Sequence, residues 1–510
     1  MIMAGELKLQ GSPVIKVGSR PTWVEGSHHS SFQAAFQGLT WLDVLRRRYE
    51  ATGHQAYRTR YIRLLKSWTS KFADIRAPAP RWVWYDMAQG QRAAVFACAI
   101  GFLGPRPWLM RAVHLAEQVL KDKKLSRYDG EGNHSLWQDM GLITLARIVS
   151  DRRGELQGSS RLRAMLNRSV SPRGESVEGS AAYQALNARW WAEAVTLAGW
   201  QGTPLARRVT AMRQVYADLV TPWGSLMGFG DTQSETPAMT RASLPQAHSL
   251  STYPVLGFAQ ARSATSGSMV LLRYGAAGTN QLHGHADAGS IQFGACGRTL
   301  LGDSGMFGYS PTTASGQAAR RYVRSAWAHS VVVPTGTSVD PGKRSTLVVR
   351  DRGGVIYFQI SIPLRDGSRW RRDVVYSRDG AWVLVVDTLA AGGLSLWQLP
   401  ADSTFVRDGS SIVEQRDAGD CALSITVPDA NGLSLVRAGA LVGWTSRQFD
   451  ALDARTVAVG AVTPSDPSAV LVTAGTPTSA GDEDVELTMI GPRSYRIQAG
   501  KSLSVVTVRD

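Results

Sequence analysis

Apolar side chains recur at helical spacing between residues 31 and 222. Residues three or four apart share one face of an α-helix, because the helix turns about every 3.6 residues. Short breakers such as APAPR, GPRP and YDGEGN separate the apolar runs. Successive helices with short links pack as antiparallel pairs, so this half predicts either a solenoid or a closed ring of helical hairpins. Three of the stripes are Phe32, Phe36, Leu39 and Leu42; Tyr57, Tyr61, Leu64, Trp68 and Phe72; and Leu205, Val209, Met212, Tyr216 and Leu219.

After about residue 250 the apolar period changes to two. Segments such as STLVVRD, GVIYFQISI and AWVLVVDTL alternate or run β-branched between turns rich in Gly, Asp, Asn and Pro. Many short strands with no helices between them predict antiparallel sheets stacked as a sandwich. Residues 222–252 form the natural joint between the two halves.

These patterns predict an N-terminal extension at 1–30, a helical domain at 31–240 and a β domain at 241–510. A chain of 510 residues is too long for one ordinary core, which agrees with several domains. Residues 1–30 and 474–484 have the composition of loops.

The distribution of charge says more about possible binding partners than the overall composition does. The formal net charge is +15, and residues 1–250 hold 32 Lys and Arg against 19 Asp and Glu, compared with 24 against 22 in the remainder. A basic first half attracts a polyanion, which could be nucleic acid, an anionic lipid surface or an acidic polysaccharide. The sequence contains no helix-turn-helix, zinc finger or RNA-binding signature, so nucleic acid is the least supported partner.

The sequence says little about the cellular compartment of the protein. Three cysteines, Cys98, Cys296 and Cys421, lie far apart without a CxxC pair, so we expect no disulfide framework. No run approaches the length of a membrane span, and the first residues lack the apolar core of a signal peptide. The chain as written is expected to be cytoplasmic, and a misassigned start could hide an export signal.

The stretch QLHGHADAGSIQFGACGRTLLGDSGMFGY, residues 281–309, is the first candidate for chemistry. His283 and His285 are two residues apart, and on a strand they would share one face. Such a pair could bind a metal, move a proton or do one of each; two polar residues on a solvated strand is the alternative. His329 could complete a set with His285 and Asp303, since two imidazoles and a carboxylate make a zinc site, although spacing alone does not establish a metal.

Two helix starts are further candidates. Asn133 precedes a helical run and could be its N-cap, or it could bind a substrate carboxylate together with His134. Ser180 could cap the helix that carries Tyr183, which leaves a packing role for the phenol. Tyr183 could instead trade a proton if neighbouring cations lower its pKa, with Glu178 as a buried hydrogen-bonding partner.

The segments GNHSLWQDMGLITLARI, ESVEGSAAYQ, HGHADAGSIQFGACGRTLLGDSGMFGY and AWAHSVVV occur in this order and resemble the heparinase II/III-like polysaccharide lyases. The resemblance spans about residues 80–400. It implies a multidomain fold, α then β, in which an incomplete α/α toroid precedes an antiparallel β-sandwich. It also implies cleavage of uronic-acid polysaccharides by β-elimination.

The resemblance assigns roles residue by residue. Asn133 and His134 would engage and neutralise the uronate carboxylate. Tyr183 would be the acid, with a second role as base left open, and His283 would be the partner base on the other side of the cleft. A further set, His285, Asp303 and His329, matches positions that hold a zinc ion in some members, where the ion would be mainly structural.

Some positions depart from the family pattern. Gln184 stands where a histidine is often expected, and Gln398 where several members carry another histidine. Such positions shape the cleft, so they affect the choice of polysaccharide more than the reaction class. Trp84 and Arg92 are candidate subsite residues, with helix packing as the alternative.

The function predicted is therefore a lyase that acts on an acidic polysaccharide or oligosaccharide. A glycan-binding or exopolysaccharide-biosynthesis-associated protein of the same fold is the second hypothesis. A glycoside hydrolase is the third hypothesis, because α/α toroids also host glycosidases that use two carboxylates. It ranks last because no convincing pair of carboxylates stands out in this sequence. The polysaccharide, endo or exo action and the oligomeric state are not set by these residues.

Overall fold

The structure, a computed structural model, describes residues 1–510 with several gaps. The residues outside the description are 10–11, 27–29, 77, 239–243, 276–281, 310, 312, 418–419, 429–431, 440–441, 476–485, 500–501 and 509–510. Gln281, which begins the histidine-bearing stretch, and most of the predicted loop 474–484 lie outside the described residues.

The chain divides into two compact units, which we describe separately. The first unit comprises Met1–Pro172 and Asn187–Thr210, and the second comprises Arg173–Leu186 and Ala211–Asp510. Helices α8 and α9 each contribute residues to both units. The units group residues by proximity and differ in extent from the predicted ranges 31–240 and 241–510, which stay predictions of the domain boundaries.

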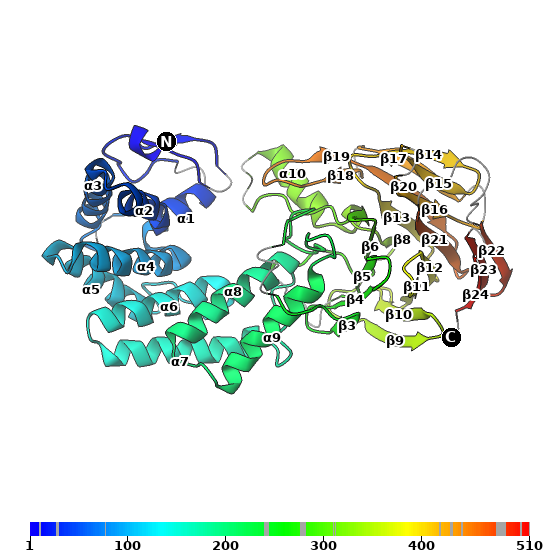
Figure 1. Cartoon of the computed structure of the whole chain (residues 1–510), viewed down its shortest axis with the longest axis horizontal. Coiled ribbons are helices and arrows are strands. Elements are labelled where there is room, and N and C mark those ends of the chain that lie inside the picture. Colours follow the sequence, from blue (N-terminus) through cyan, green and yellow to red (C-terminus); the bar gives the residue numbers. More distant parts are fainter. Residues whose placement is uncertain are drawn as a thin grey trace. The chain divides into compact units, whose positions relative to one another are not determined.

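Helices build the first unit, as the apolar periodicity predicts (Figure 1). The predicted stripe on α3 is buried, with Tyr61, Leu64 and Trp68 each at most 2% exposed. No helix in the described part of the chain is both long and apolar enough to cross a bilayer. The helices are α1 (Ser30–Gly38), α2 (Asp43–Thr52), α3 (Gln55–Lys71), α4 (Asp86–Leu103), α5 (Pro107–Lys121), α6 (Gly132–Ile148), α7 (Arg152–Ser169), α8 (Ala181–Leu197) and α9 (Pro204–Leu219).

The N-terminal residues are more ordered than their composition suggests. Strand β1 (Glu6–Leu7) pairs with β2 (Ile15–Lys16), and Trp23 is fully buried with its Nε1 donating to Ser67 Oγ at 3.1 Å. The loop character predicted for residues 1–30 is wrong for these parts, because a buried indole supplies packing that a Gly- and Ser-containing composition hides.

Helices α4 and α6 cross closely because glycines line their contact. A Cβ on Gly90 would lie 2.1 Å from the carbonyl oxygen of Trp137, and a Cβ on Gly141 would lie 2.9 Å from the Cα of Gly90. Only glycine allows backbones to approach this closely. The contact holds α6, whose second and third residues are Asn133 and His134.

Antiparallel sheets build the second unit, and every strand pair that the structure describes within its sheets is antiparallel. A five-stranded sheet has the order β3-β4-β5-β6-β7, a four-stranded sheet β17-β20-β13-β8, an eight-stranded sheet β14-β15-β16-β21-β12-β11-β10-β9 and a three-stranded sheet β22-β23-β24. The strands are β3 (Leu250–Tyr253), β4 (Phe258–Arg262), β5 (Met269–Arg273), β6 (Ile291–Ala295), β7 (Arg298–Leu301), β8 (Val332–Pro334), β9 (Thr346–Arg352), β10 (Val355–Pro363), β11 (Arg369–Ser377), β12 (Trp382–Leu389), β13 (Gly393–Gln398), β14 (Thr404–Asp408), β15 (Ser411–Gln415), β16 (Ala422–Thr426), β17 (Leu433–Arg437), β18 (Trp444–Thr445), β19 (Asp453–Ala454), β20 (Thr456–Val462), β21 (Ser468–Gly475), β22 (Glu486–Gly491), β23 (Ser494–Ala499) and β24 (Ser502–Thr507).

The middle of the eight-stranded sheet is buried on both faces, whereas its edge strands β9 and β14 are largely exposed. Val383 and Val385 of β12 pack into a core shared with the five- and four-stranded sheets, while Leu384 and Val386 pack against the three-stranded sheet. Alternate residues of one strand thus serve two cores, which explains the continuous apolar run in AWVLVVDTL. The predicted fold class, a helical region followed by stacked antiparallel sheets, is confirmed.

A helix also lies within the β half. Helix α10 (Ala314–Val323) begins after Thr313, whose Oγ1 accepts a hydrogen bond from Gly316 N at 3.1 Å. The expectation of strands with no helices between them is wrong here, because a segment of ten residues makes only about three helical turns, too few to stand out among strands. Helix α10 brings Arg320 into the second unit's polar core.

A buried arginine fixes the backbone around the candidate site. Arg372 of β11 is fully buried and pairs with Asp387 of β12 at 2.8 Å. Its Nη1 donates to the carbonyl oxygens of Gly289, at 2.6 Å, and Ser330, at 2.9 Å. The eight-stranded sheet therefore holds two segments that follow candidate histidines, one after His285 and one after His329.

A disulfide joins Cys296 to Cys421, with their Cα atoms 6.2 Å apart. Cys296 lies in the turn between β6 and β7, and Cys421 immediately precedes β16, so the bridge links the five-stranded sheet to the eight-stranded sheet. Cys98 is a free, exposed thiol. The expectation that the cysteines form no disulfide is wrong, because residues 125 positions apart in sequence meet only once the sheets are stacked.

We expect alkylation of the denatured, unreduced protein to modify Cys98 alone, and prior reduction to expose all three cysteines. Reduction, or Cys296→Ser, should lower the free energy of unfolding by about 2–4 kcal/mol, because the bridge limits the unfolded chain. Mass spectrometry and urea titration measure these effects. Cys98→Ser is the control and should shift stability by less than about 0.5 kcal/mol. Modification of three cysteines without reduction would show that the bridge does not form.

Candidate functional site

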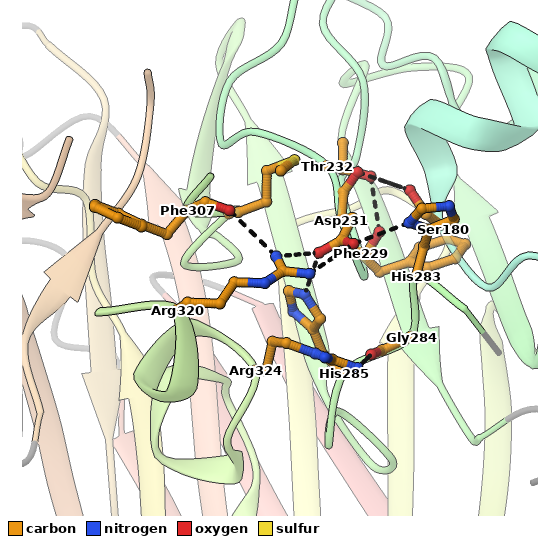
Figure 2. Close-up of polar contacts among 12 residues, drawn as sticks. Ser180, Phe229, Asp231, Thr232, His283, Gly284, His285, Phe307, Arg320 and Arg324 are labelled. Carbon is orange, nitrogen blue, oxygen red and sulfur yellow. Dashed lines mark hydrogen bonds and ion pairs between the residues drawn. The ribbon is translucent and has the colours of Figure 1, made fainter. Parts of the chain in front are cut away.

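His283 and His285 lie in a loop that precedes β6, so the strand predicted for them is wrong. They nevertheless meet at one side chain, the carboxylate of Asp231, as Figure 2 shows. His283 Nδ1 lies 2.9 Å from Asp231 Oδ2, and His285 Nε2 lies 3.1 Å from Asp231 Oδ1. Each imidazole thus uses its own carboxylate oxygen.

Arg320 completes the environment of Asp231. Its guanidinium contacts both carboxylate oxygens, with Nη2 2.9 Å from Oδ2, and Nη1 also donates to Phe307 O at 3.2 Å (Figure 2). Burial by itself favours the neutral acid, but hydrogen bonds from His283, His285 and Arg320 hold the pKa of Asp231 below its ordinary value. The centre of the site is therefore a buried carboxylate with a negative charge.

Main-chain bonds tie three segments of the second unit together around this carboxylate. Asp231 N donates to His283 O at 2.8 Å, and His283 N donates to Glu178 O at 3.1 Å. Gly230 has a φ of 59°, and a Cβ there would lie 2.3 Å from the Gly179 carbonyl oxygen. The GFGD turn thus requires glycine before Asp231, and it brings the carboxylate beside the start of α8.

Tyr183 lies in the first turn of α8, where its N–H donates to Ser180 Oγ at 3.4 Å, so the capping role expected for Ser180 is supported. Its ring stacks on His283 with centroids 3.6 Å apart and planes at 9°. Its hydroxyl oxygen lies 2.7 Å from that of Tyr309. Two phenols and an imidazole therefore form one cluster.

Tyr183 holds its proton strongly. Burial, together with the nearby carboxylates of Glu178 and Asp231, raises the pKa of Tyr183 to about 12. The condition set from the sequence, a pKa lowered by neighbouring cations, is not met, because burial and the two carboxylates outweigh the lowering by the Tyr309 hydrogen bond and by Arg320. The phenol is therefore protonated at neutral pH, which is the state that a proton donor needs.

His283 does not lie across a cleft from Tyr183. Its ring is in direct contact with the phenol, so the position implied by the family resemblance is wrong. Glu178 Oε2 lies 3.5 Å from His283 Nε2, on the opposite side of the ring from the Asp231 contact. A protonated His283 would thus be flanked by two carboxylates.

His285, Asp303 and His329 come together as the sequence predicts. One candidate ligand atom from each lies within 4.8 Å of the others, and His329 Nδ1 is 2.8 Å from Asp303 Oδ2. Both histidines are buried, and among the described residues neither His285 Nδ1 nor His329 Nε2 has a hydrogen-bond partner. Buried nitrogen lone pairs without partners fit a bound cation, so the group can hold a metal.

Asp287, the last residue of HGHAD, has a different partner. It is 2% exposed and pairs with Arg273 of β5, with Nε 3.0 Å from Oδ2. Burial opposes ionisation, but Arg273 holds the pKa of Asp287 below its ordinary value. This pair fixes the loop to the five-stranded sheet.

Three other predicted residues are placed by packing, and their substrate roles stay predictions. Arg92 is buried and donates to the carbonyl oxygens of Gln37 and Val83, each at 2.6 Å, and burial lowers its pKa to about 9. Trp84 ends a short helix (Arg81–Trp84) with its ring 5.7 Å from that guanidinium. Gln184 is fully buried and donates to Gly174 O at 2.9 Å.

Asn133 and His134 lie in the first turn of α6 in the first unit. The helix begins at Gly132 with Glu131 as N-cap, so the capping role expected for Asn133 is wrong. Asn133 is 6% exposed, and the ring of His134 lies 6.1 Å from that of Tyr85. Their role in carboxylate binding stays a prediction.

Sequence reasoning missed Asp231, Tyr309 and Arg320. Asp231 follows the glycines of GFGD, a turn signal that could have marked it. Tyr309 ends the stretch that was singled out, but nothing in its spacing distinguishes it from a packing residue. Arg320 lies on α10, a helix that the sequence does not predict because strand-like segments surround it.

Comparisons with known proteins bear on this arrangement. Residues 245–470 match the family model described as Heparinase II/III-like, C-terminal. No curated protein sequence matches the chain. Similar solved structures include the heparan sulfate lyase HepC from Pedobacter heparinus, with 16% identity and a TM-score of 0.71 over 99% of this chain and 87% of that chain. Heparinase III has 13% identity and a TM-score of 0.75 over 92% and 82%. The Streptomyces coelicolor A3 chondroitin AC lyase in complex with chondroitin sulphate has 11% identity and a TM-score of 0.56 over 92% and 80%.

The raised pKa of Tyr183 predicts a specific pH dependence of stability. In the unfolded chain tyrosine ionises near pH ~10, whereas Tyr183 in the fold ionises at about 12. The stability due to the neutral phenol is thus fully present below about pH 10 and is lost as the pH rises towards 12. Urea unfolding of the wild type and Tyr183→Phe should show a constant difference from about pH 7 to 9. Above about pH 10 the wild type should lose up to about 2 kcal/mol relative to the variant. A change in the difference below about pH 9 would contradict the raised pKa.

Proposed function

We propose that this chain, whose residues 245–470 match the family model described as Heparinase II/III-like, C-terminal, cleaves an acidic polysaccharide or oligosaccharide by β-elimination. The observation that carries the proposal is the contact of protonated Tyr183 with His283, whose Nδ1 is held by Asp231. The solved structures of similar fold include lyases named for heparan sulfate and chondroitin. The basic surplus of residues 1–250 supports an acidic substrate.

The chemistry needs a base and an acid. The C5 proton of a uronate is weakly acidic and becomes removable when the adjacent carboxylate is neutralised, the part predicted for Asn133 and His134. His283 donates from Nδ1 to Asp231, so Nε2 has the lone pair that can take the proton. The C4–O4 bond then breaks, a C4–C5 double bond forms, and Tyr183 donates its proton to the departing oxygen.

The contact between acid and base also supports a stereochemical proposal. Tyr183, Tyr309 and His283 form one cluster, so the proton is taken and given on one face of the sugar ring. In glucuronate the C5 hydrogen and O4 lie on the same face, whereas in its C5 epimer iduronate they lie on opposite faces. We therefore propose a preference for glucuronate-type residues.

An assay with uronate polymers that differ in C5 configuration tests both proposals. The product is measured by the ultraviolet absorbance of its C4–C5 double bond. Tyr183→Phe should lower the rate about 10²–10⁴-fold, because the proton donor is removed while the ring that stacks on His283 remains. Tyr495→Phe is the matched control: this buried hydroxyl has no partner in the described part of the chain and lies on β23, so the rate should be unchanged. No new double bond with any uronate polymer, from folded protein, would reject lyase activity.

The other hypotheses have distinct outcomes. Binding of a uronate polymer without product would identify a glycan-binding protein. New reducing ends without a double bond would identify a hydrolase, but no observation favours it. Glu178 and Asp231 are 3% and 1% exposed, and Asp231 is already paired with Arg320, so neither is an available acid.

We propose zinc as the ion bound by His285, Asp303 and His329. Two imidazole nitrogens and a carboxylate are a common zinc ligand set. When bound, the ion would be mainly structural, tying the loop before β6 to the end of β7 and to the segment before β8.

Elemental analysis of purified protein should find about one zinc per chain, and chelation should lower the melting temperature. His329→Ala should abolish zinc retention, because it removes a buried ligand whose ring is fully enclosed. His114→Ala, at an exposed position on α5, is the control and should retain zinc. Protein without zinc and with no response to chelation would remove the proposal.

The compartment is a further proposal. Disulfides persist in oxidising compartments and are rare in the cytoplasm. The Cys296–Cys421 bridge therefore favours a periplasmic or secreted protein over the cytoplasmic location expected from the sequence. Fractionation of the native host, with the cysteines trapped by alkylation at lysis, tests the location.

A further inference from the structure

The carboxylate of Asp231 serves two neighbouring sites. Oδ2 faces His283, the proposed base, and Oδ1 faces His285, a candidate metal ligand (Figure 2). Its side chain is fully buried, and Arg320 contacts both oxygens. One group thus holds a ring from each site.

We propose that Asp231 is a positioning residue that selects the tautomers of His283 and His285 together, and so couples proton transfer to metal binding. The proposal rests on the proposed function for the role of His283. Asp231 is fully buried and is not among the three candidate metal ligands, so in this proposal it acts through the two histidines.

The first step concerns protons. A carboxylate paired with a guanidinium has no hydrogen to give, so both of its oxygens only accept. A neutral His283 must then carry its hydrogen on Nδ1 and keep the lone pair on Nε2, because Asp231 Oδ2 lies 2.9 Å from Nδ1 whereas Glu178 Oε2 lies 3.5 Å from Nε2. His285 must carry its hydrogen on Nε2 and keep the lone pair on Nδ1, the buried atom that has no partner among the described residues.

The second step concerns rigidity. Arg320 binds the carboxylate through two nitrogens, which fixes the plane of the group. The backbone of Asp231 is fixed as well, since its carbonyl oxygen accepts from Ser180 Oγ at 2.9 Å. Thr232 Oγ1 accepts from Ala182 N at 3.0 Å. The carboxylate therefore cannot turn to follow one histidine without leaving the other.

The third step is the consequence of changing one oxygen. In Asp231→Asn the side chain keeps its shape, but one acceptor becomes an NH₂ donor. That donor must face His283, His285 or Arg320, and each ring nitrogen that meets it must become an acceptor. A ring that changes tautomer loses either the base at His283 Nε2 or the ligand lone pair at His285 Nδ1.

Long-range proton–nitrogen correlation spectra of the full chain labelled with ¹⁵N-histidine report the tautomers directly. The nine histidines can be assigned by single His→Gln variants. In the wild type we expect His283 as the Nδ1–H form and His285 as the Nε2–H form. In Asp231→Asn at least one of the two should change.

Function supplies the second readout. In Asp231→Asn, zinc affinity measured by competition with a chelator should fall about 10–100-fold, as for other groups that orient metal ligands. The lyase kcat should fall about 10²-fold with KM little changed, because the buried Asp231 acts through His283. Asp373→Asn is the matched control, since Asp373 is a buried carboxylate of β11 that pairs with Arg371 and Arg493, away from the cluster. It should reduce stability but leave both tautomers and zinc affinity unchanged.

Two results would overturn the proposal. One is folded Asp231→Asn with both tautomers and the zinc affinity of the wild type. The other is wild-type protein with His283 as the Nε2–H form or His285 as the Nδ1–H form, and this test holds even if the variant does not fold. If the wild type cleaves no uronate polymer, the proposed function fails, while the spectra and zinc affinity still decide the role of Asp231.

Discussion

The ion pair between Asp231 and Arg320 is the interaction on which the polar centre of the second unit depends. A lone carboxylate buried this deeply would take up a proton, and it would then no longer accept hydrogen bonds from two imidazoles. Hydrogen bonds from His283, His285 and Arg320 keep it charged, and the two-nitrogen contact of the guanidinium fixes its plane. Tyr183 stacks on the His283 ring that this carboxylate holds, so the position of Tyr183 also depends on the Asp231–Arg320 pair.

The broad fold could be predicted from sequence because each half has a dominant period. Stripes such as Tyr61, Leu64 and Trp68 mark helices, and the β-branched runs mark strands of a sheet whose middle is buried on both faces. The misses have physical causes. Helix α10 is too short to show a period, Trp23 is buried by contacts made elsewhere, and the two bridged cysteines meet only after the sheets stack.

The candidate site could be predicted only where the family resemblance assigns residues, because its members are dispersed along the chain. His285, Asp303 and His329 meet as expected, and Glu178 and Tyr183 both lie beside His283. Asp231 and Arg320 could not be found, because aspartate and arginine are common on surfaces and their role arises from tertiary contacts alone. Burial likewise separates Arg92 and Gln184 from exposed residues of the same type, and no local pattern reports burial of a polar side chain.

The bridge between Cys296 and Cys421 has a topological meaning for the cluster. It closes the intervening chain into a covalent ring, and Asp303, Tyr309, Arg320 and His329 all lie within that ring. Tyr183, Asp231, His283 and His285 all precede it. The pairings of Tyr183 with Tyr309 and of Asp231 with Arg320 therefore each join an open segment to a closed one. If the disulfide forms early in folding, it restricts the conformations open to four of these eight residues. The polar cluster is then completed when the residues that precede the ring pack against a loop that is already closed.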